Sequence, residues 1–181
     1  MSALAVVVVL ATAGCGGDDG PGDADPPPTA PAGTGAGDLG LLDPAALGAV
    51  RVVVTYADGS TREWCLLLAD DDDERGQGLM SVTDVALGGY DGMVFAYDEP
   101  TSGRFWMRNT RLPLTITFVA ADGRPVTTIP MEPCPDDQPS CPTYGPGTAY
   151  RWAIEVPTAL ASEVPLADAA TIEVTGESCS V

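Results

Sequence analysis

The sequence predicts one β-rich domain, all-β or α+β, in the form of a small barrel or sandwich of about eight short strands with one short helix. Three observations predict this class. Short segments of alternating apolar and polar residues recur from residue 50 onward, Asp-Gly pairs mark two tight turns between them, and no segment sustains a helical period. The 181 residues allow one domain with additional segments.

The first predicted strands form a β-hairpin. Residues 50–56 alternate around valine, Asp58-Gly59 is a two-residue turn signal, and residues 61–69 form the returning strand. The acidic run that follows, residues 70–74, is expected to be a solvated turn, because it lacks the spaced oxygen ligands and the bidentate glutamate of a calcium loop.

The remaining strands follow at short intervals. A second hairpin is expected around Asp122-Gly123. Between the last two strands we expect a short helix or a turn over residues 158–167. The predicted strands cover residues 92–97, 104–110, 114–121, 124–132, 150–157 and 170–175.

Residues 1–14 are predicted to be a signal peptide of the lipoprotein type. Ala3–Ala13 is uncharged and mostly apolar, and this run is too short to span a bilayer. Thr12-Ala13-Gly14-Cys15 resembles a bacterial lipobox, although Thr12 stands where leucine is commonest and no basic residue precedes the apolar run. We therefore expect Cys15 to be lipidated and to hold the protein to the membrane outside the cytoplasm. The alternative is an ordinary cleaved signal.

Residues 15–48 are predicted to be the lipidated cysteine followed by a disordered tether, and residues 49–181 to be the folded domain. Gly16–Asp38 consists of glycine, proline, alanine, aspartate and threonine, with no large apolar side chain. Such a segment cannot bury a core. The folded domain is therefore expected to stand away from the membrane surface.

Composition excludes several function classes. The net charge of −18 argues against nucleic acid and against anionic lipid headgroups. The chain has no histidine, and all eight of its basic residues are arginine. Without imidazole or lysine it can form neither Ser-His-Asp and Cys-His catalytic sites nor Schiff bases. We expect no cofactor and no metal, and the expected partners are the membrane, through the lipid, and an unknown small ligand or envelope protein.

Four cysteines remain besides Cys15, which is typical of disulfides in an exported chain. Three pairings are possible. Cys134 and Cys141 bracket a short proline-rich loop, which favours a local disulfide and leaves Cys65 to pair with Cys179. The rival interpretation, a four-cysteine metal site, is weakened by the absence of Cys-x-x-Cys spacing.

Five blocks together resemble the DUF192 family of small, β-rich prokaryotic domains, whose activity is not established. The resemblance covers residues 50–176. Two departures are notable: Val82 stands where the family usually has arginine, and Thr115 where it usually has aspartate. We hypothesise that these two charges pair in relatives and are lost together here. The blocks are ERGQGLM (74–80), GMVFAY (92–97), FWMRNT (105–110), LPLTITFV (112–119) and AIEVP (153–157).

The segment GRFWMRNTRLPL, residues 103–114, contains three of the eight arginines beside a phenylalanine, a tryptophan and a methionine. On a strand, Phe105, Met107 and Asn109 would share one face, of which Phe105 and Met107 are expected to face the core. Arg104, Trp106, Arg108 and Thr110 would share the other face. That outer face either is exposed to solvent, with arginine guanidinium groups stacked on the indole ring, or is a recognition site for an anion or planar group.

Further candidate residues have both a structural and a binding interpretation. Asn109 and Thr110 could form a turn or bind a ligand. Arg75 and the glycines beside it could form a structural turn or approach a ligand. Glu155 lies among apolar residues and is expected to pair with an arginine, Arg75 or Arg108, because an isolated buried carboxylate is costly.

The favoured function is therefore a membrane-tethered, extracytoplasmic binding or interaction module. A carboxylate-dependent envelope enzyme, for example one acting on glycans, is the alternative, and a purely structural envelope role is a third interpretation. A glycosidase needs two carboxyl groups about 5–9.5 Å apart across a cleft. The available acids are Asp91, Asp98, Glu99, Asp122 and Glu155.

Overall fold

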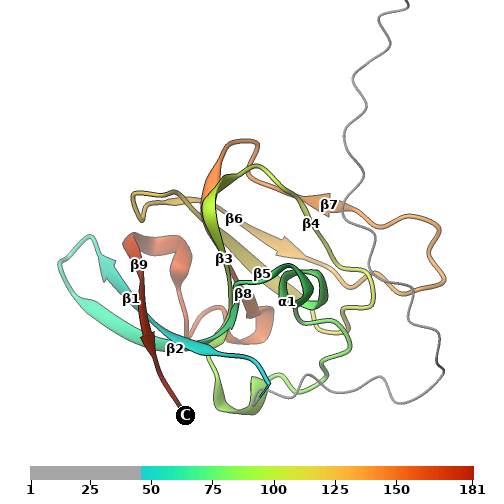
Figure 1. Cartoon of the computed structure of the whole chain (residues 1–181), viewed down its shortest axis with the longest axis horizontal. Coiled ribbons are helices and arrows are strands. Elements are labelled where there is room, and N and C mark those ends of the chain that lie inside the picture. Colours follow the sequence, from blue (N-terminus) through green and yellow to red (C-terminus); the bar gives the residue numbers. More distant parts are fainter. Residues whose placement is uncertain (1–45) are drawn as a thin grey trace, which may run out of the picture.

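Figure 1 shows a computed structural model of the chain, which describes residues 46–181. The predicted signal peptide, Cys15 and most of the predicted tether lie outside the described residues. The elements are β1 (Ala49–Tyr56), β2 (Thr61–Ala69), α1 (Asp72–Gln77), η1 (Leu87–Gly89), β3 (Gly92–Thr101), β4 (Phe105–Trp106), β5 (Leu114–Val119), β6 (Pro125–Met131), β7 (Thr143–Tyr144), β8 (Tyr150–Pro157), η2 (Thr158–Leu160), η3 (Leu166–Asp168) and β9 (Ala169–Ser178), where η marks a 3-10 helix.

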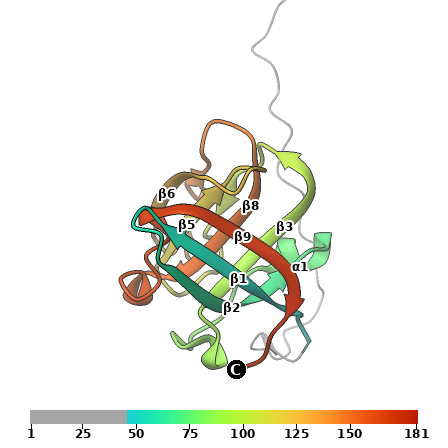
Figure 2. The same ribbon diagram turned by 90° about the vertical axis from the view of Figure 1, so that its left-hand side faces the viewer.

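Seven strands form one sheet in the order β6-β5-β8-β3-β2-β1-β9, and β4 pairs with β7 in a separate ribbon. The β2–β3 pair is parallel and the other strand pairs are antiparallel. The sheet curls into a half-barrel, so that β9, β1 and β2 lie in front of β8 and β5 in Figure 2. The predicted class, a β-rich single domain with one short helix, is confirmed.

A tight backbone contact joins the two ends of the curled sheet. The Ile172 N–H on edge strand β9 donates to the carbonyl oxygen of Gly123, in the turn that leads into the opposite edge strand, β6, at 2.7 Å. Gly123 has a φ of +83°, and a Cβ there would lie 2.9 Å from the Ile172 carbonyl oxygen. Glycine is therefore required at the place where the curl nearly closes.

The two faces of the sheet bury two separate apolar clusters. The inner cluster fills the curl with Val50, Val52 and Val54 of β1 and with residues of β8, β9 and the η2–η3 segment. The outer cluster lies beneath α1, the η1 loop and the β4–β7 ribbon, and it includes Phe118 and Tyr150. Fully burying one such side chain stabilises a fold by about 1.5–3 kcal/mol, so both clusters contribute substantially.

Both predicted hairpins are present, with Gly59 and Gly123 at positive φ in their turns. The acidic run, however, is not a simple solvated turn. Asp71 caps α1 by accepting a hydrogen bond from the Glu74 N–H at 2.8 Å, and the Glu74 carboxylate reaches back to the Asp71 N–H. Acidic residues stabilise the first turn of a helix because the positive end of the helix dipole lies there.

The predicted strand over residues 104–110 is also shorter than expected. Only Phe105 and Trp106 form β4, because Asn109 adopts a left-handed backbone with a φ of 57° and the chain turns there. The turn is closed by the Thr110 N–H, which donates to the Met107 carbonyl at 3.1 Å.

The favoured cysteine pairing is confirmed. The long-range disulfide Cys65–Cys179 joins β2 to the chain end beyond β9, and the local disulfide Cys134–Cys141 closes the loop between β6 and β7. With these four cysteines paired, the rival four-cysteine metal site is not formed. Among residues 46–181, no helix is long and apolar enough to cross a membrane.

Candidate functional site

The β4 segment places a cation against an aromatic ring at the domain surface. The guanidinium carbon of Arg108 lies 5.7 Å from the centre of the Trp106 ring, and both side chains are half-buried. Met107, between them in the sequence, is fully buried, as the alternation predicted. Within the described part of the chain Arg108 forms no ion pair, so its charge is available to a ligand.

Arg104 continues this surface but is held in place by the protein. Its Nε donates to the Thr143 hydroxyl at 2.8 Å, and one of its terminal nitrogens donates to the Thr143 carbonyl at 2.6 Å. Thr143 pairs with Trp106 across the β4–β7 ribbon. We call Arg104, Trp106 and Arg108 the arginine–tryptophan edge.

Asn109 and Thr110 have structural roles beneath this edge. The Asn109 N–H donates to the Cys134 carbonyl at 3.0 Å, and the Asn109 carbonyl accepts from the Ser81 N–H at 2.9 Å. Thr110 is buried, with 7% of its surface exposed, so it does not share the outer face as the sequence suggested. The turn at Asn109 breaks the strand alternation and directs Thr110 inward.

Arg75 fastens α1 to the sheet. One terminal nitrogen donates to the Ala96 carbonyl of β3 at 2.8 Å, the other contacts the Asp72 carboxylate at 2.7 Å, and the guanidinium lies 5.1 Å from the Tyr97 ring centre. The arginine side chain is only 20% exposed. These contacts favour the structural interpretation of Arg75, an arginine that ties a turn to the core.

Tyr97 and Tyr150 connect Arg75 to the arginine–tryptophan edge. Their rings meet edge to face at 5.7 Å, and the Tyr150 hydroxyl donates to the Gly103 carbonyl at 3.1 Å, directly before Arg104. Burial raises the pKa of the Tyr97 hydroxyl, while Tyr150 and the Arg75 guanidinium oppose this shift and the charge of Glu155 adds to it. Burial likewise raises the pKa of Tyr150.

Glu155 lies in the middle of β8, opposite Met93 of β3 and Ile116 of β5. Only 4% of its surface is exposed, and burial raises the pKa of its carboxyl from 4.5 to about 8. The expected ion pair with an arginine is wrong: no cation of the described residues lies within 4 Å of this carboxylate. A carboxyl group this buried is neutral at pH 7 because solvation by water is lost.

The other four candidate acids lie in different settings. Asp91 precedes β3 and accepts a hydrogen bond from the Cys65 N–H at 2.9 Å, whereas Asp122 forms an ion pair with Arg124 at 2.7 Å. Asp98 and Glu99 are exposed near the far end of β3. The surroundings of these four carboxyl groups therefore differ from one another.

The two positions that depart from the family pattern do not face each other in this chain. Val82 packs in the outer cluster, whereas Thr115 is opposite Val156 of the inner cluster and its hydroxyl lies 3.1 Å from that of Thr158. This placement speaks against the hypothesis that the corresponding charges pair directly in relatives.

Sequence reasoning missed three residues that position the edge: Tyr97, Thr143 and Tyr150. Tyr97 could have been found, since it alternates with Met93 and Phe95 on β3 and these three side chains belong to the outer cluster. Thr143 and Tyr150 gave no local signal, because their partners lie 39 and 47 residues away in the sequence.

Comparison with known proteins agrees with this fold. The DUF192 family model, described as Uncharacterized ACR, matches residues 53–174. A candidate transcription regulator from Sinorhizobium meliloti 1021 is 26% identical, with a TM-score of 0.60 over 72% of this chain and 97% of that one. A protein of unknown function from Novosphingobium aromaticivorans is 28% identical, with a TM-score of 0.58 over 76% of this chain and 94% of that one.

No curated protein is significantly similar in sequence. The family model nevertheless spans well over half of the chain, and it begins within β1 and ends within β9. The solved structures share the fold at sequence identities above a quarter. The chain therefore belongs to the DUF192 family, a family whose function is not established.

Proposed function

We propose that the protein is a membrane-tethered, extracytoplasmic binding module whose arginine–tryptophan edge takes a planar anion. The observation that carries this proposal is the guanidinium of Arg108 over the Trp106 ring, without an ion pair among the described residues. A guanidinium binds carboxylates through two parallel hydrogen bonds, and an indole ring stacks on planar groups.

The disulfides support a location outside the cytoplasm. Disulfides persist in oxidising compartments and are rare in the bacterial cytosol. Both disulfides of this chain brace the folded domain, and the sequence before it has the features of a lipoprotein signal followed by a tether. The S. meliloti protein is described as a candidate transcription regulator. We do not extend this role to the present chain, because a net charge of −18 opposes contact with phosphates.

Binding is tested by calorimetric titration with benzoate, a planar anion that offers both a carboxylate and a ring. Benzamide, which has nearly the same shape without the charge, is the matched ligand. We expect benzoate to bind more tightly than benzamide, and Arg108→Gln to weaken benzoate binding about tenfold or more, as loss of a charged hydrogen bond requires. Equal affinities for the two ligands would refute the proposed site.

The control variant is Arg62→Gln, which removes one charge from an exposed arginine of β2. It should leave benzoate binding unchanged, whereas Trp106→Leu should weaken it. If Arg62→Gln weakens binding as much as Arg108→Gln, the effect is one of net charge and the proposed site is wrong.

The tether is tested separately, on protein extracted from bacterial membranes. The intact mass should correspond to a chain that begins at an acylated Cys15, and Cys15→Ser should release the protein from the membrane fraction. An unprocessed and unlipidated chain in the cytoplasm would contradict the proposed location.

A further inference from the structure

A second place on the domain, separate from the arginine–tryptophan edge, is a surface cavity of about 420 Å³ between the loop before β3 and the turn after β8. Its volume lies within the range of small-molecule sites, about 300–1,000 Å³. The side chains that give it chemical character are Trp64, Tyr90, Asp91, Leu160, Glu163 and Val164.

The lining combines negative charge with aromatic and aliphatic surface. Two acidic residues and two aromatic residues line the cavity, and none of the eight arginines lines it. The face of an aromatic ring attracts cations through its quadrupole, and this attraction is strongest for tryptophan. Leu160 and Val164 add apolar surface that suits an alkyl group.

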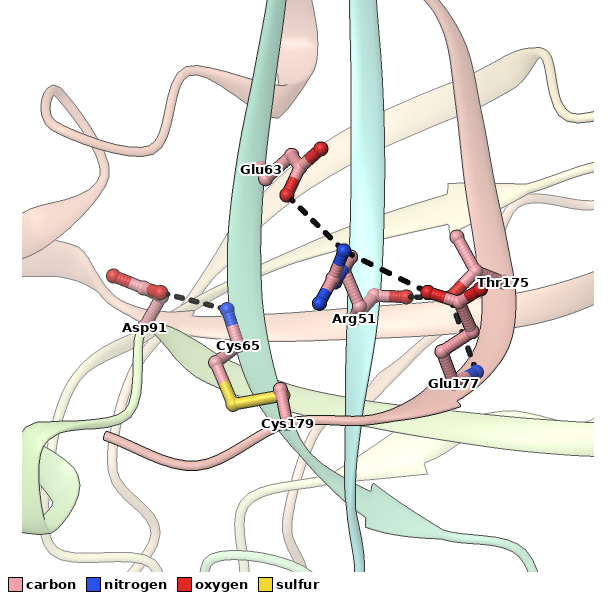
Figure 3. Close-up of a disulfide and its surroundings, with 7 residues drawn as sticks. All are labelled: Arg51, Glu63, Cys65, Asp91, Thr175, Glu177 and Cys179. Atoms are coloured by element: carbon pink, nitrogen blue, oxygen red, sulfur yellow. Dashed lines mark hydrogen bonds and ion pairs between the residues drawn. A yellow bond between two sulfur atoms is a disulfide. The ribbon is translucent and has the colours of Figure 1, made fainter.

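The side that contributes Asp91 is fixed in advance of binding. The Asp91 carboxylate accepts from the Cys65 N–H at 2.9 Å, and the Asp91 N–H donates to the Cys65 carbonyl at 3.0 Å. Figure 3 shows this carboxylate pointing to Cys65 beside the long-range disulfide. Trp64 and Tyr90 are the chain neighbours of these two residues, so their backbone is held as well. A prearranged site loses less entropy on binding.

Two other occupants fit less well. Among residues 46–181, no group of three or more acidic or cysteine side chains is placed to hold a metal ion. A glycosidase requires one carboxyl that is kept protonated by apolar surroundings. Glu163 is exposed and Asp91 is engaged with a backbone N–H, so neither is in such surroundings.

We infer that this cavity binds an organic cation of the alkylammonium class. The charged group lies near the Asp91 and Glu163 carboxylates and against the rings of Trp64 and Tyr90, and the remaining alkyl part lies against Leu160 and Val164. The strongly acidic chain, with its net charge of −18, would also raise the local concentration of such cations.

The test is calorimetric titration of the whole protein with choline and with its neutral carbon isostere, in which a tert-butyl group replaces the trimethylammonium group. The two probes have the same shape and differ in charge. Choline should bind and its affinity should fall with added salt, whereas the isostere should bind markedly more weakly. Equal affinities, or no heat of binding with millimolar choline, would overturn the inference.

Variants locate the site. Trp64→Leu keeps apolar bulk but removes the ring, and should weaken choline binding about 2- to 30-fold. Glu163→Gln should weaken it about two- to fivefold. Glu173→Gln, an exposed glutamate of β9 that does not line the cavity, is the matched control and should have no effect. Choline affinity that is unchanged in Trp64→Leu and Glu163→Gln would also overturn the inference.

The test is independent of the proposed function. Arg108→Gln should abolish the preference for benzoate and leave choline binding as it is, because Arg108 does not line this cavity. If Arg108→Gln weakens choline binding as strongly as Glu163→Gln does, the cation is bound elsewhere and the inference is wrong.

Discussion

The buried carboxyl of Glu155 should make the stability of the domain fall as the pH rises through the neutral range. In the folded protein its pKa is about 8, against 4.5 for an exposed glutamate, because burial disfavours the charged form. Between these two values the folded state holds a proton that the unfolded state has released. The stability contributed by the neutral carboxyl is therefore complete below about pH 4.5 and is lost progressively up to about pH 8.

The magnitude follows from the difference between the two pKa values. Each pH unit between them costs about 1.4 kcal/mol, so at pH 7 the domain should be about 3 kcal/mol less stable than a chain without this ionisation. The free energy of unfolding of a protein is typically about 5–15 kcal/mol, so this loss is a large fraction of the total.

The assay is urea unfolding of the wild type and Glu155→Gln from pH 4 to pH 9, followed by tryptophan fluorescence. The amide is close in shape and cannot ionise, so any cost of burying it does not depend on pH. The free energy of unfolding of the variant minus that of the wild type should be constant below about pH 4.5 and then rise by about 1.4 kcal/mol per pH unit. Glu173→Gln, at an exposed position, should show no such rise. A difference that stays flat across the neutral range would refute the reasoning.

Three further predictions concern the framework, each measured by urea unfolding. Replacing both cysteines of the long-range disulfide, which spans 114 residues, should lower the free energy of unfolding by about 5 kcal/mol. Replacing both cysteines of the local disulfide, which spans 7 residues, should lower it by about 2–3 kcal/mol. The reverse order would contradict the chain-entropy argument. Gly59→Ala should cost about 1–2 kcal/mol for its left-handed backbone. Gly123→Ala should cost more than Gly59→Ala, because the new methyl at Gly123 meets the Ile172 carbonyl oxygen whereas the one at Gly59 meets nothing within 4 Å. Equal costs would argue against the contact that joins the sheet ends. Arg75→Gln should lower the free energy of unfolding by about 1.5–3 kcal/mol, whereas Arg62→Gln, at an exposed position, should lower it by less than about 0.5 kcal/mol. Equal losses would show that Arg75 does not fasten α1 to the sheet.

Local sequence signals predicted most of the strands. Both Asp-Gly hairpins formed because these turns require glycine at positive φ, and the valines of β1 alternate into the inner cluster as expected. The helix α1 was missed although its capping box was readable: Asp71 and Glu74 stand at the two positions of that motif, inside a run that looked merely acidic.

Other features depend on contacts between distant parts of the chain. The parallel β2–β3 pairing brings Leu66 opposite Gly92 across the α1 crossover. No periodicity in the sequence predicts this pairing. The left-handed backbone at Asn109 ended the expected strand early. Glu155 was recognised as an unusual acid among apolar neighbours, but the expected arginine is absent because Arg75 bonds to β3 and Asp72 while Arg108 lies on Trp106.

The candidate site was predicted in its chemistry more than in its geometry. Alternation correctly placed Met107 in the core and Arg108 beside Trp106 on the outer side. What the sequence could not provide is the support beneath them, since Arg104 is held by Thr143 and the Gly103 carbonyl by Tyr150, both from segments that follow much later.

The central claim, that the arginine–tryptophan edge binds a planar anion, is tested most directly by nuclear magnetic resonance of the three tryptophan indole N–H signals during titration with benzoate. Trp64 lies in the cavity on another part of the domain and Trp152 packs against the inner cluster, so each serves as an internal control. We predict that the Trp106 signal moves and saturates while the other two stay in place. A titration that leaves Trp106 unmoved, or that moves all three signals alike, would contradict the account.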